Sequence, residues 1–254
     1  NCHHCGFKSK VFYRDKKEYK KVFFKPMQPK QVDNKEILYK YFEKRYISKE
    51  VLETYKIGIN AQKEIIFPYY KNGELVNVKY RSNLGDGKKT FRQEKDTEKT
   101  FFGMDLIENK ESLIIVEGEI DVLSFAEFGI LSVSIPQGAT EKKMEYLDNC
   151  WEWLQQFKTY IIAVDNDEAG DILKTNLIQR LNKNKCKVVN FKQYKDANEV
   201  LCNNDDLKKF VDEAESVVPE GIVPFNKSIE KIIDFYYNGN IKGMSTGWDK
   251  LDNI

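Results

Sequence analysis

The amino-acid sequence predicts an α/β domain with a parallel-rich sheet and helices on both faces, preceded by a smaller, basic α+β subdomain. Two patterns lead to this prediction. From residue 112 onward, short apolar runs alternate with amphipathic stretches at the spacing of strand–helix units, which is typical of a covered parallel sheet. Upstream, residues 64–82 alternate with a period of two on both sides of Asn72-Gly73, which predicts an antiparallel hairpin.

The segment before the hairpin, residues 33–56, predicts two short helices separated around residues 45–48. Ser48 is suited to cap the second helix, because its hydroxyl can accept a hydrogen bond from a free backbone N–H of the first turn. In the second hairpin strand, alternate side chains point to opposite faces. We therefore expect one apolar face (Val76, Val78, Tyr80) and one polar, basic face (Asn77, Lys79, Arg81).

The α/β half is predicted element by element from its apolar runs. We expect strands at 113–116, 130–134, 160–164 and 188–191. Helices are expected to about residue 128, at about 141–157 and 168–182, and as two short pieces ending near 216. Beyond a proline-bounded linker at 219–224, residues 226–238 predict a helix with a narrow apolar stripe formed by Ile229, Ile232, Ile233 and Tyr236.

Composition excludes several classes of protein. The chain has 254 residues, and no apolar run approaches the roughly 18 residues that a membrane span needs. Its first residues lack the apolar core of a signal peptide. Five cysteines without even spacing argue against a disulfide framework and for a reducing compartment. We therefore expect a cytoplasmic protein with no membrane partner.

The net charge of +1 hides an asymmetry between the two halves. Residues 1–110 carry 25 Lys and Arg against 15 Asp and Glu, whereas residues 111–254 carry 16 against 25. A basic half joined to an acidic half is compatible with one part that meets a polyanion and another that holds cations. Two ordinary solvated surfaces of different composition would give the same counts.

Acidic residues follow several of the predicted parallel strands. Glu117 comes directly after the first strand, Asp165 and Asp167 follow the third, and Asp196 follows the fourth. The carboxyl ends of parallel strands share one edge, so these side chains can converge there. Converging carboxylates repel one another unless a cation neutralises them, and Mg²⁺ prefers oxygen ligands. The alternative for each aspartate is a helix N-cap.

Two of these segments carry a family resemblance. Residues 116–121 (Val-Glu-Gly-Glu-Ile-Asp) and 165–170 (Asp-Asn-Asp-Glu-Ala-Gly) resemble the Toprim motifs of primases, above all of the fused primase-helicases of phages and of the Twinkle type, and more distantly of DnaG primases. Residues 195–199 resemble the later Toprim motif, and 135–140 resemble the turn after the second strand. The basic subdomain that precedes Toprim in these proteins is resembled by Lys79, Arg81, Lys89 and residues 101–103 (Phe-Phe-Gly).

The resemblance implies a role for each matching residue. Glu117 would be the catalytic acid/base or a metal-linked carboxylate, and Asp165 and Asp167 would be catalytic and hold Mg²⁺ or Mn²⁺. Asp121 and Asp196 would support the metal site. Nucleotide or DNA phosphates would be bound by Lys79, Arg81, Lys89, Arg92 and Lys195. A lysine on an exposed strand face is often merely solvated, and that alternative stands beside the binding role.

Cys2 and Cys5 form half of a zinc site, because structural zinc takes four ligands. In the resembled family two such pairs make an N-terminal zinc ribbon that reads the template. We therefore expect zinc binding only where the missing half of the ribbon is supplied.

The predicted organisation has five parts. Residues 1–32 would be a ribbon remnant with a basic linker, 33–110 the basic subdomain of an RNA-polymerase core, and 111–216 the Toprim domain. A linker with the amphipathic helix (217–240) and the start of a truncated RecA-like helicase domain (241–254) would follow. No Walker A pattern occurs in the chain, so we expect no ATPase here.

The resemblance implies a DNA primase that makes short RNA primers on single-stranded DNA from NTPs by metal-dependent nucleotidyl transfer. Its partner would be the helicase domain of the full-length, hexameric protein. The resemblance also implies that it acts in the cytoplasm of a bacterium or a phage-infected host cell. One alternative is a catalytically retired primase-like module that binds DNA and assembles the hexamer, although Glu117, Asp165, Asp167 and Asp196 are all present. A second alternative is a Toprim nuclease.

Overall fold

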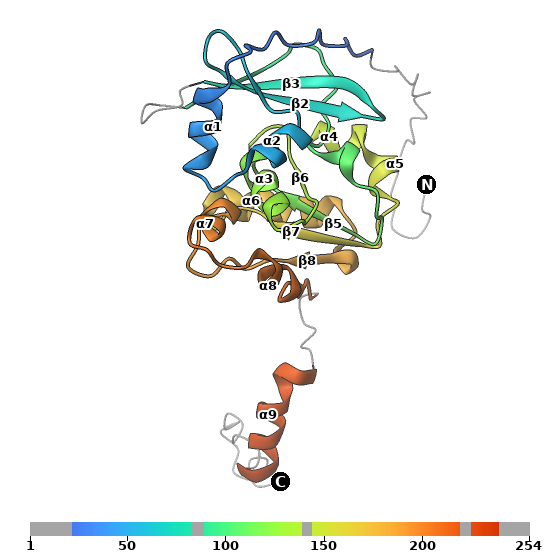
Figure 1. Cartoon of the computed structure of the whole chain (residues 1–254). Coiled ribbons are helices and arrows are strands. Elements are labelled where there is room, and N and C mark those ends of the chain that lie inside the picture. Colours follow the sequence, from blue (N-terminus) through green and yellow to red (C-terminus); the bar gives the residue numbers. More distant parts are fainter. Residues whose placement is uncertain (1–21, 83–88, 139–143, 219–224, 239–254) are drawn as a thin grey trace, which may run out of the picture.

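The computed structural model describes residues 22–82, 89–138, 144–218 and 225–238. It contains two sheets, and Figure 1 shows the antiparallel sheet above helices α2 (Lys49–Thr54) and α3 (Glu119–Glu127), with the parallel-rich sheet below them. In the part of the chain that is described, no helix is long and apolar enough to cross a membrane. The cysteines of the expected zinc half-site, Cys2 and Cys5, lie outside the described residues, as does the expected start of a helicase domain at 241–254.

The antiparallel half confirms the predicted helices and hairpin. Helices α1 (Glu36–Glu43) and α2 (Lys49–Thr54) are separated as expected, and the Ser48 hydroxyl accepts a hydrogen bond from the backbone N–H of Val51. Asn72 and Gly73 both have positive φ angles, as the tight hairpin turn requires. The four strands lie in sequence order: β1 (Gly58–Ile59), β2 (Ile65–Lys71), β3 (Glu74–Ser82) and β4 (Thr90–Gln93).

The two edge strands of this sheet were not predicted. β1 has only two residues, which is too short for a periodic pattern to be visible. Three of the four residues of β4 are exposed, so its sequence lacks a buried face.

The polar face of β3 is buried, which differs from the solvated face that is usual for such a strand. Asn77 is fully buried, and Lys79 and Arg81 are only 8% and 7% exposed. The reason is that this face of the sheet packs against the second half of the chain. Lys79 bonds Glu119 there, whereas Asn77 is held by Gln93 and Thr97 from the edge of its own subdomain. The period of two determined which residues share a face, but it could not tell what covers that face.

The second sheet is parallel with one antiparallel edge. Its strand order is β6-β5-β7-β8-β9, and only the β8–β9 pairing is antiparallel. The bounds are β5 (Ser112–Val116), β6 (Val133–Ser134), β7 (Thr159–Ala163), β8 (Cys186–Val188) and β9 (Glu215–Ser216).

The strand predicted at 188–191 is misplaced, because β8 ends at Val188. The apolar residues Val189 and Phe191 lie beyond the sheet and belong to the core, where the ring of Phe191 packs against Phe210 with centroids 6.0 Å apart. Their hydrophobicity therefore marks a buried loop. The strand predicted at 130–134 is likewise shorter, and β9 was not expected.

Helices cover both faces of the parallel-rich sheet, as expected. In β5, Ile114 and Val116 face a core that contains residues of α3 (Glu119–Glu127), α7 (Ala197–Cys202) and α8 (Leu207–Asp212). Leu113 and Ile115 face a second core on the side of α4 (Glu145–Asn149), α5 (Trp151–Leu154) and α6 (Glu168–Arg180). Two short 3₁₀ helices span Met104–Leu106 and Lys183–Lys185.

The first of these cores joins the two sheets. Ile65, Phe67 and Tyr69 of β2 belong to the same buried cluster as Val122 and Leu123 of α3. Burying large aliphatic and aromatic side chains contributes about 1.5–3 kcal/mol each, so this shared core holds the antiparallel sheet against the parallel one.

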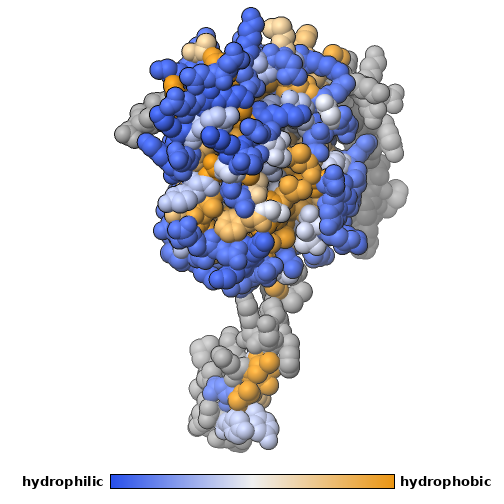
Figure 2. Space-filling view, in the orientation of Figure 1, coloured by the Kyte–Doolittle hydropathy of each residue, from blue (hydrophilic) through white to orange (hydrophobic). Residues whose placement is uncertain are grey.

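Helix α9 (Phe225–Asn238) matches the predicted helix closely. Its described side chains include the predicted stripe, and Ile232, Ile233 and Tyr236 are exposed. Figure 2 shows the apolar side chains along this helix. The linker expected at 219–224 lies outside the described residues.

Candidate active site

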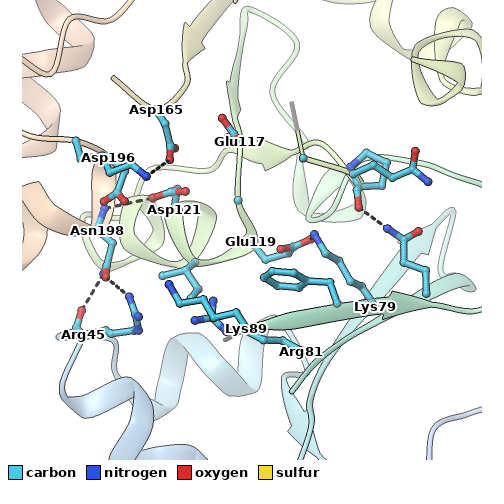
Figure 3. A pocket seen from close by; sticks show the side chains of 18 of the residues that line it. Arg45, Lys79, Arg81, Lys89, Glu117, Glu119, Asp121, Asp165, Asp196 and Asn198 are labelled. Carbon is cyan, nitrogen blue, oxygen red and sulfur yellow. Dashed lines mark hydrogen bonds and ion pairs between the residues drawn. The ribbon is translucent and has the colours of Figure 1, made fainter. Parts of the chain in front are cut away.

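A cavity of about 570 Å³ opens between β3 and β4 on one side and the carboxyl ends of β5 and β7 on the other. One wall is acidic and the other is basic (Figure 3). The acidic residues that line it are Glu117, Glu119, Asp121, Asp165 and Asp196. The basic residues are Arg45, Lys79, Arg81, Lys89, Arg92 and Lys195.

The acidic wall is built from the loops that follow the parallel strands. Glu117 follows β5 directly, and Asp121 lies in the first turn of α3. Asp165 follows β7, while Asp196 caps α7 by accepting a hydrogen bond of 2.8 Å from the backbone N–H of Glu199. The topology thus brings together four of the five carboxylates predicted for the metal site.

The electrostatics of the acidic wall show that these carboxylates influence one another. Burial raises the pKa of Asp121 well above its ordinary value, and the negative charges of Asp196 and Asp165 raise it further. The pKa of Asp165 is also raised, mainly by burial and next by Asp196. A cation bound among these groups would relieve both effects.

The donor set fits Mg²⁺ or Mn²⁺. All donors are carboxylate oxygens, and Mg²⁺ commonly binds through one or two carboxylates while keeping several waters. Within the described residues no three or more His, Cys, Asp or Glu side chains are arranged as a ready-made metal cage. Because the carboxylates line an open cavity, an ion held there can keep part of its water shell.

Asp167 has a different position from the other predicted ligands. It caps α6, accepting a hydrogen bond of 3.0 Å from the backbone N–H of Gly170, and it does not line the cavity. That bond, followed by Lys195, lowers its pKa. Asp167 and Asp196 thus each cap a helix, which was the alternative interpretation of these aspartates. They also follow strands at the carboxyl edge of the sheet, so the two interpretations do not exclude each other.

Lys195 lies between the two aspartates that follow β7. Its ammonium nitrogen is 3.1 Å from Oδ2 of Asp167 and 3.4 Å from Oδ2 of Asp165. The hydrogen bond to Asp167 is the main cause of its raised pKa. A positive charge is therefore held where the two carboxylates approach each other, which shows that this place favours a cation.

The basic wall contains cations that have no carboxylate partner at hydrogen-bond distance among the described residues. Arg81 is almost fully buried, and its Nε has no hydrogen-bond partner among the described residues. Its guanidinium lies over the rings of Tyr41 and Phe91, at 5.4 and 5.7 Å from their centroids. The charge of Arg81 is the main cause of the lowered pKa of Lys89. Crowded cations of this kind favour a bound anion such as phosphate.

Two predicted phosphate-binding residues have carboxylate partners instead. Lys79 donates a hydrogen bond of 2.7 Å to the buried Glu119. Arg92 forms a two-pronged interaction with Glu64, with nitrogen–oxygen distances of 3.0 and 2.6 Å, and stacks on Tyr80. Both line the cavity, but their charges are already balanced within the protein.

The residues of the cavity that were not singled out from the sequence include Arg45, Phe91, Glu119 and Asn198. Arg45 lies in the loop after α1, far in sequence from the acidic motifs, so no local pattern pointed to it. Glu119 and Asn198 lie within quoted motifs, two residues after Glu117 and Asp196. That spacing was a usable signal, because it keeps both near the same sheet edge.

The fold and the two-walled cavity define a Toprim-type protein, with carboxylates at the ends of parallel strands. A family model described as Toprim-like matches residues 114–201. Together with the relatives described next, it shows that the chain contains a Toprim-like domain and is similar to Toprim primases of the primase-helicase type.

Two curated plant relatives support the family. The chain is 36% identical over 242 residues to the Twinkle homolog protein, chloroplastic/mitochondrial, of Arabidopsis thaliana; the match covers 84% of this chain and 33% of that protein. It is also 36% identical over 184 residues to the Primase homolog protein of the same plant, covering 63% of this chain and 53% of the relative. The chain thus spans about a third and about half of the lengths of these relatives.

Solved structures share the fold. The primase fragment of the bacteriophage T7 primase-helicase matches with a TM-score of 0.54 and 28% identity, over 66% of this chain and 72% of that one. The DnaG catalytic core matches with a TM-score of 0.56 over 72% of this chain and 74% of that one, and at 18% identity it supports the fold alone.

Proposed function

We propose that this chain is the primase part of a primase-helicase. It would bind single-stranded DNA and NTPs and synthesise short RNA primers by metal-dependent nucleotidyl transfer. The observation that carries the proposal is the cavity itself, in which a carboxylate wall faces a wall of arginine and lysine. One wall suits a metal ion and the other suits phosphates, and nucleotidyl transfer needs both.

The acidic wall would hold the metal. Asp165, Asp121 and Asp196 are its candidate ligands, with Glu117 as a further ligand or as the group that accepts the proton of the primer 3′-hydroxyl. When bound, Mg²⁺ lowers the pKa of such a hydroxyl and stabilises charge on the phosphate under attack. Asp167 would act indirectly, by capping α6 and holding Lys195 beside Asp165.

The basic wall would bind the phosphates. Arg81 and Lys89 would take the triphosphate or the template backbone, because neither has a carboxylate at hydrogen-bond distance among the described residues. Lys195 would bridge from the acidic wall to the same phosphates. Lys79 and Arg92 would shape the cavity, and each would bind phosphate only if it exchanged its present carboxylate partner.

The wider partners follow from the same proposal. Cys2 and Cys5 would bind zinc together with a second pair supplied from further upstream, and the complete ribbon would read the template. The helicase domain of a longer, hexameric protein would be the main protein partner. The T7 relative is described in its structure as bound to an RNA/DNA hybrid, and a DnaG relative as bound to single-stranded DNA.

Primer synthesis tests the proposal directly. The chain would be incubated with single-stranded DNA of mixed sequence, labelled NTPs and Mg²⁺ or Mn²⁺. An Asp165→Ala/Asp167→Ala variant is expected to make no product, whereas Asp212→Ala, which removes an exposed aspartate of α8, is expected to match the unmodified chain.

Other outcomes separate the alternatives. DNA binding without product, both in this chain and in a longer chain that supplies the complete ribbon, would indicate a retired primase. Product only from the longer chain would support the primase function and show that it depends on the ribbon. Metal-dependent nicking of DNA without primer synthesis would favour a Toprim nuclease.

A further inference from the structure

Asn198 connects the two walls of the cavity through nearly every polar atom that it has. Its side-chain Oδ1 accepts a hydrogen bond of 2.8 Å from Nη1 of Arg45. Its Nδ2 donates to the backbone oxygen of Arg45 at 3.1 Å and to the hydroxyl of Ser124 at 3.0 Å. Its backbone N–H donates to Oδ1 of Asp121 at 3.3 Å. Figure 3 shows Asn198 between Asp121 and Arg45.

These contacts engage every hydrogen-bonding group of the Asn198 side chain. An asparagine side chain offers two N–H donors and one carbonyl acceptor, and here both donors and the acceptor are engaged. The residue is only 6% exposed, so water does not compete strongly for these groups. Alanine or leucine would supply none of the side-chain bonds, and aspartate would lose both donations.

Arg45 is held at both its backbone and its guanidinium, which restricts its position more than one hydrogen bond would. The same guanidinium lies 5.0 Å from the centroid of the Tyr41 ring, and Arg81 lies 5.4 Å from the same centroid. The place of Arg45 is therefore linked through one aromatic ring to the place of Arg81. Asn198 thereby anchors one end of the basic wall.

On the opposite side, Asn198 restrains the acidic wall. Asp121 receives the backbone N–H of Asn198 at one carboxylate oxygen. Asn198 also lies two positions after Asp196, within the turn that Asp196 caps. One short segment, residues 196–198, thus supplies one carboxylate of the acidic wall, contacts a second one and contacts one arginine of the basic wall.

We infer that Asn198 is a positioning residue that sets the separation of the two walls, so that one nucleotide and its metal ion can contact both at once. This inference rests on the proposed function, since it assumes that a metal–nucleotide complex binds across the cavity. Asn198 itself need not touch the nucleotide. It acts through Arg45 and Asp121.

Equilibrium binding of ATP with Mg²⁺ tests this role without requiring turnover. The comparison uses the unmodified chain, Asn198→Ala and Asn203→Ala. Asn203 is a matched control, because it is an exposed asparagine at the end of the same helix whose side chain donates to the backbone oxygen of Glu199. Asn198→Ala is expected to raise Kd by about tenfold or more, as the removal of groups that orient metal ligands commonly does. The Kd of Asn203→Ala is expected to stay within about twofold of that of the unmodified chain, because surface substitutions usually have effects of about 0.5 kcal/mol or less.

A double-mutant cycle separates positioning from general loosening of the fold. Arg45→Ala and Asn198→Ala should each raise the Kd for ATP with Mg²⁺, and the double variant should bind no more weakly than the weaker single variant. Independent, multiplying effects would overturn the inference. In primer synthesis the KM for NTP should rise in parallel with Kd, whereas simple loss of folded protein would lower kcat alone.

Each remaining outcome is also decisive. If Asn198→Ala fails to fold, Ser124→Ala replaces it, because that variant removes one partner of the amide and leaves Arg45 and Asp121 in place. For Ser124→Ala, a rise in Kd that is smaller than tenfold supports the role of Asn198, and an unchanged Kd overturns it.

If the unmodified chain binds nucleotide and Asn198→Ala binds it equally well, only the inference fails. If the unmodified chain binds no ATP with Mg²⁺, the nucleotide binding proposed for this chain fails and the inference fails with it.

Discussion

The ammonium group of Lys79 donates a hydrogen bond of 2.7 Å to the carboxylate of Glu119, and both side chains are at least nine-tenths buried. Lys79 lies on β3 and Glu119 opens α3, so the pair joins the antiparallel sheet to the helix that covers the parallel one. The hydroxyl of Tyr69 donates to the same carboxylate oxygen. Burial, followed by the charge of Glu119, raises the pKa of Tyr69 well above its ordinary value.

Removing one member of this pair is expected to destabilise the fold strongly. Lys79→Met would leave Glu119 buried with only the Tyr69 hydroxyl as a described partner, and uncompensated buried charges typically cost about 3–5 kcal/mol. The measurement is the free energy of unfolding from urea titration. The double variant Lys79→Met/Glu119→Gln should recover part of the stability, because no buried charge remains. A single variant as stable as the unmodified chain would show that the pair contributes nothing.

Asp121→Asn is expected to stabilise the metal-free protein at neutral pH. The folded state raises the pKa of Asp121, so it holds the proton more tightly than the unfolded state does. The stability that depends on this proton is present below the unfolded pKa, near 4, and is lost as the pH rises through the folded pKa. The variant should therefore gain on the order of 1 kcal/mol at pH 7 in EDTA and gain little at about pH 4.

Added Mg²⁺ should narrow that difference, because a bound cation stabilises the ionised carboxylate of the unmodified chain only. Unfolding would be followed in urea at both pH values, with Asp212→Asn as an exposed control. A variant that is less stable at neutral pH without metal would contradict the raised pKa.

Gly170→Ala is expected to disrupt the acidic wall by steric conflict. A Cβ at this position would lie 1.9 Å from the backbone oxygen of Asp165 and 2.8 Å from its carbonyl carbon. Because backbone cannot rotate away as a side chain can, the loop after β7 or the start of α6 must move. We expect a decrease of about 2–3 kcal/mol or more in unfolding free energy.

The same substitution at Gly138 serves as its control. There the nearest atom of the described residues to a new Cβ is Oε1 of Glu117, at 4.0 Å, which is an ordinary contact. Its unfolding midpoint should stay close to that of the unmodified chain. Equal midpoints for both alanine variants would mean that the loop carrying Asp165 adapts without cost.

Arg81→Ala is expected to weaken binding of single-stranded DNA and to reduce its dependence on salt. Removing one bound phosphate from the interface should lower the slope of log K against log salt concentration by about 0.7. Fluorescence anisotropy of a labelled oligonucleotide at several salt concentrations measures this slope. Lys187→Ala, which removes an exposed lysine on β8, should leave it unchanged. Equal slopes for the two variants would place the DNA elsewhere.

Much of the fold could be predicted because its causes are local. The hairpin follows from Asn72-Gly73 and a period of two, and α2 begins where Ser48 can cap it. The acidic wall was also accessible, because parallel strands must end at one edge and the acids follow those ends directly. Apolar residues were also used to place strands, and this failed for Val189 and Phe191. They are buried in a loop beyond the end of β8, so the strand predicted at 188–191 was placed wrongly.

Sequence by itself determined which residues stand at the strand ends and which side chains share a face, because both depend on periodicity over a few positions. Only the tertiary structure decided how charges pair across the chain. Lys79 pairs with Glu119, and Arg92 pairs with Glu64. Arg81 has no carboxylate at hydrogen-bond distance among the described residues. Arg45 bonds Asn198, which is 153 positions away in the sequence. Such pairings arise from packing between distant segments, and a local pattern carries no information about which segment will lie opposite.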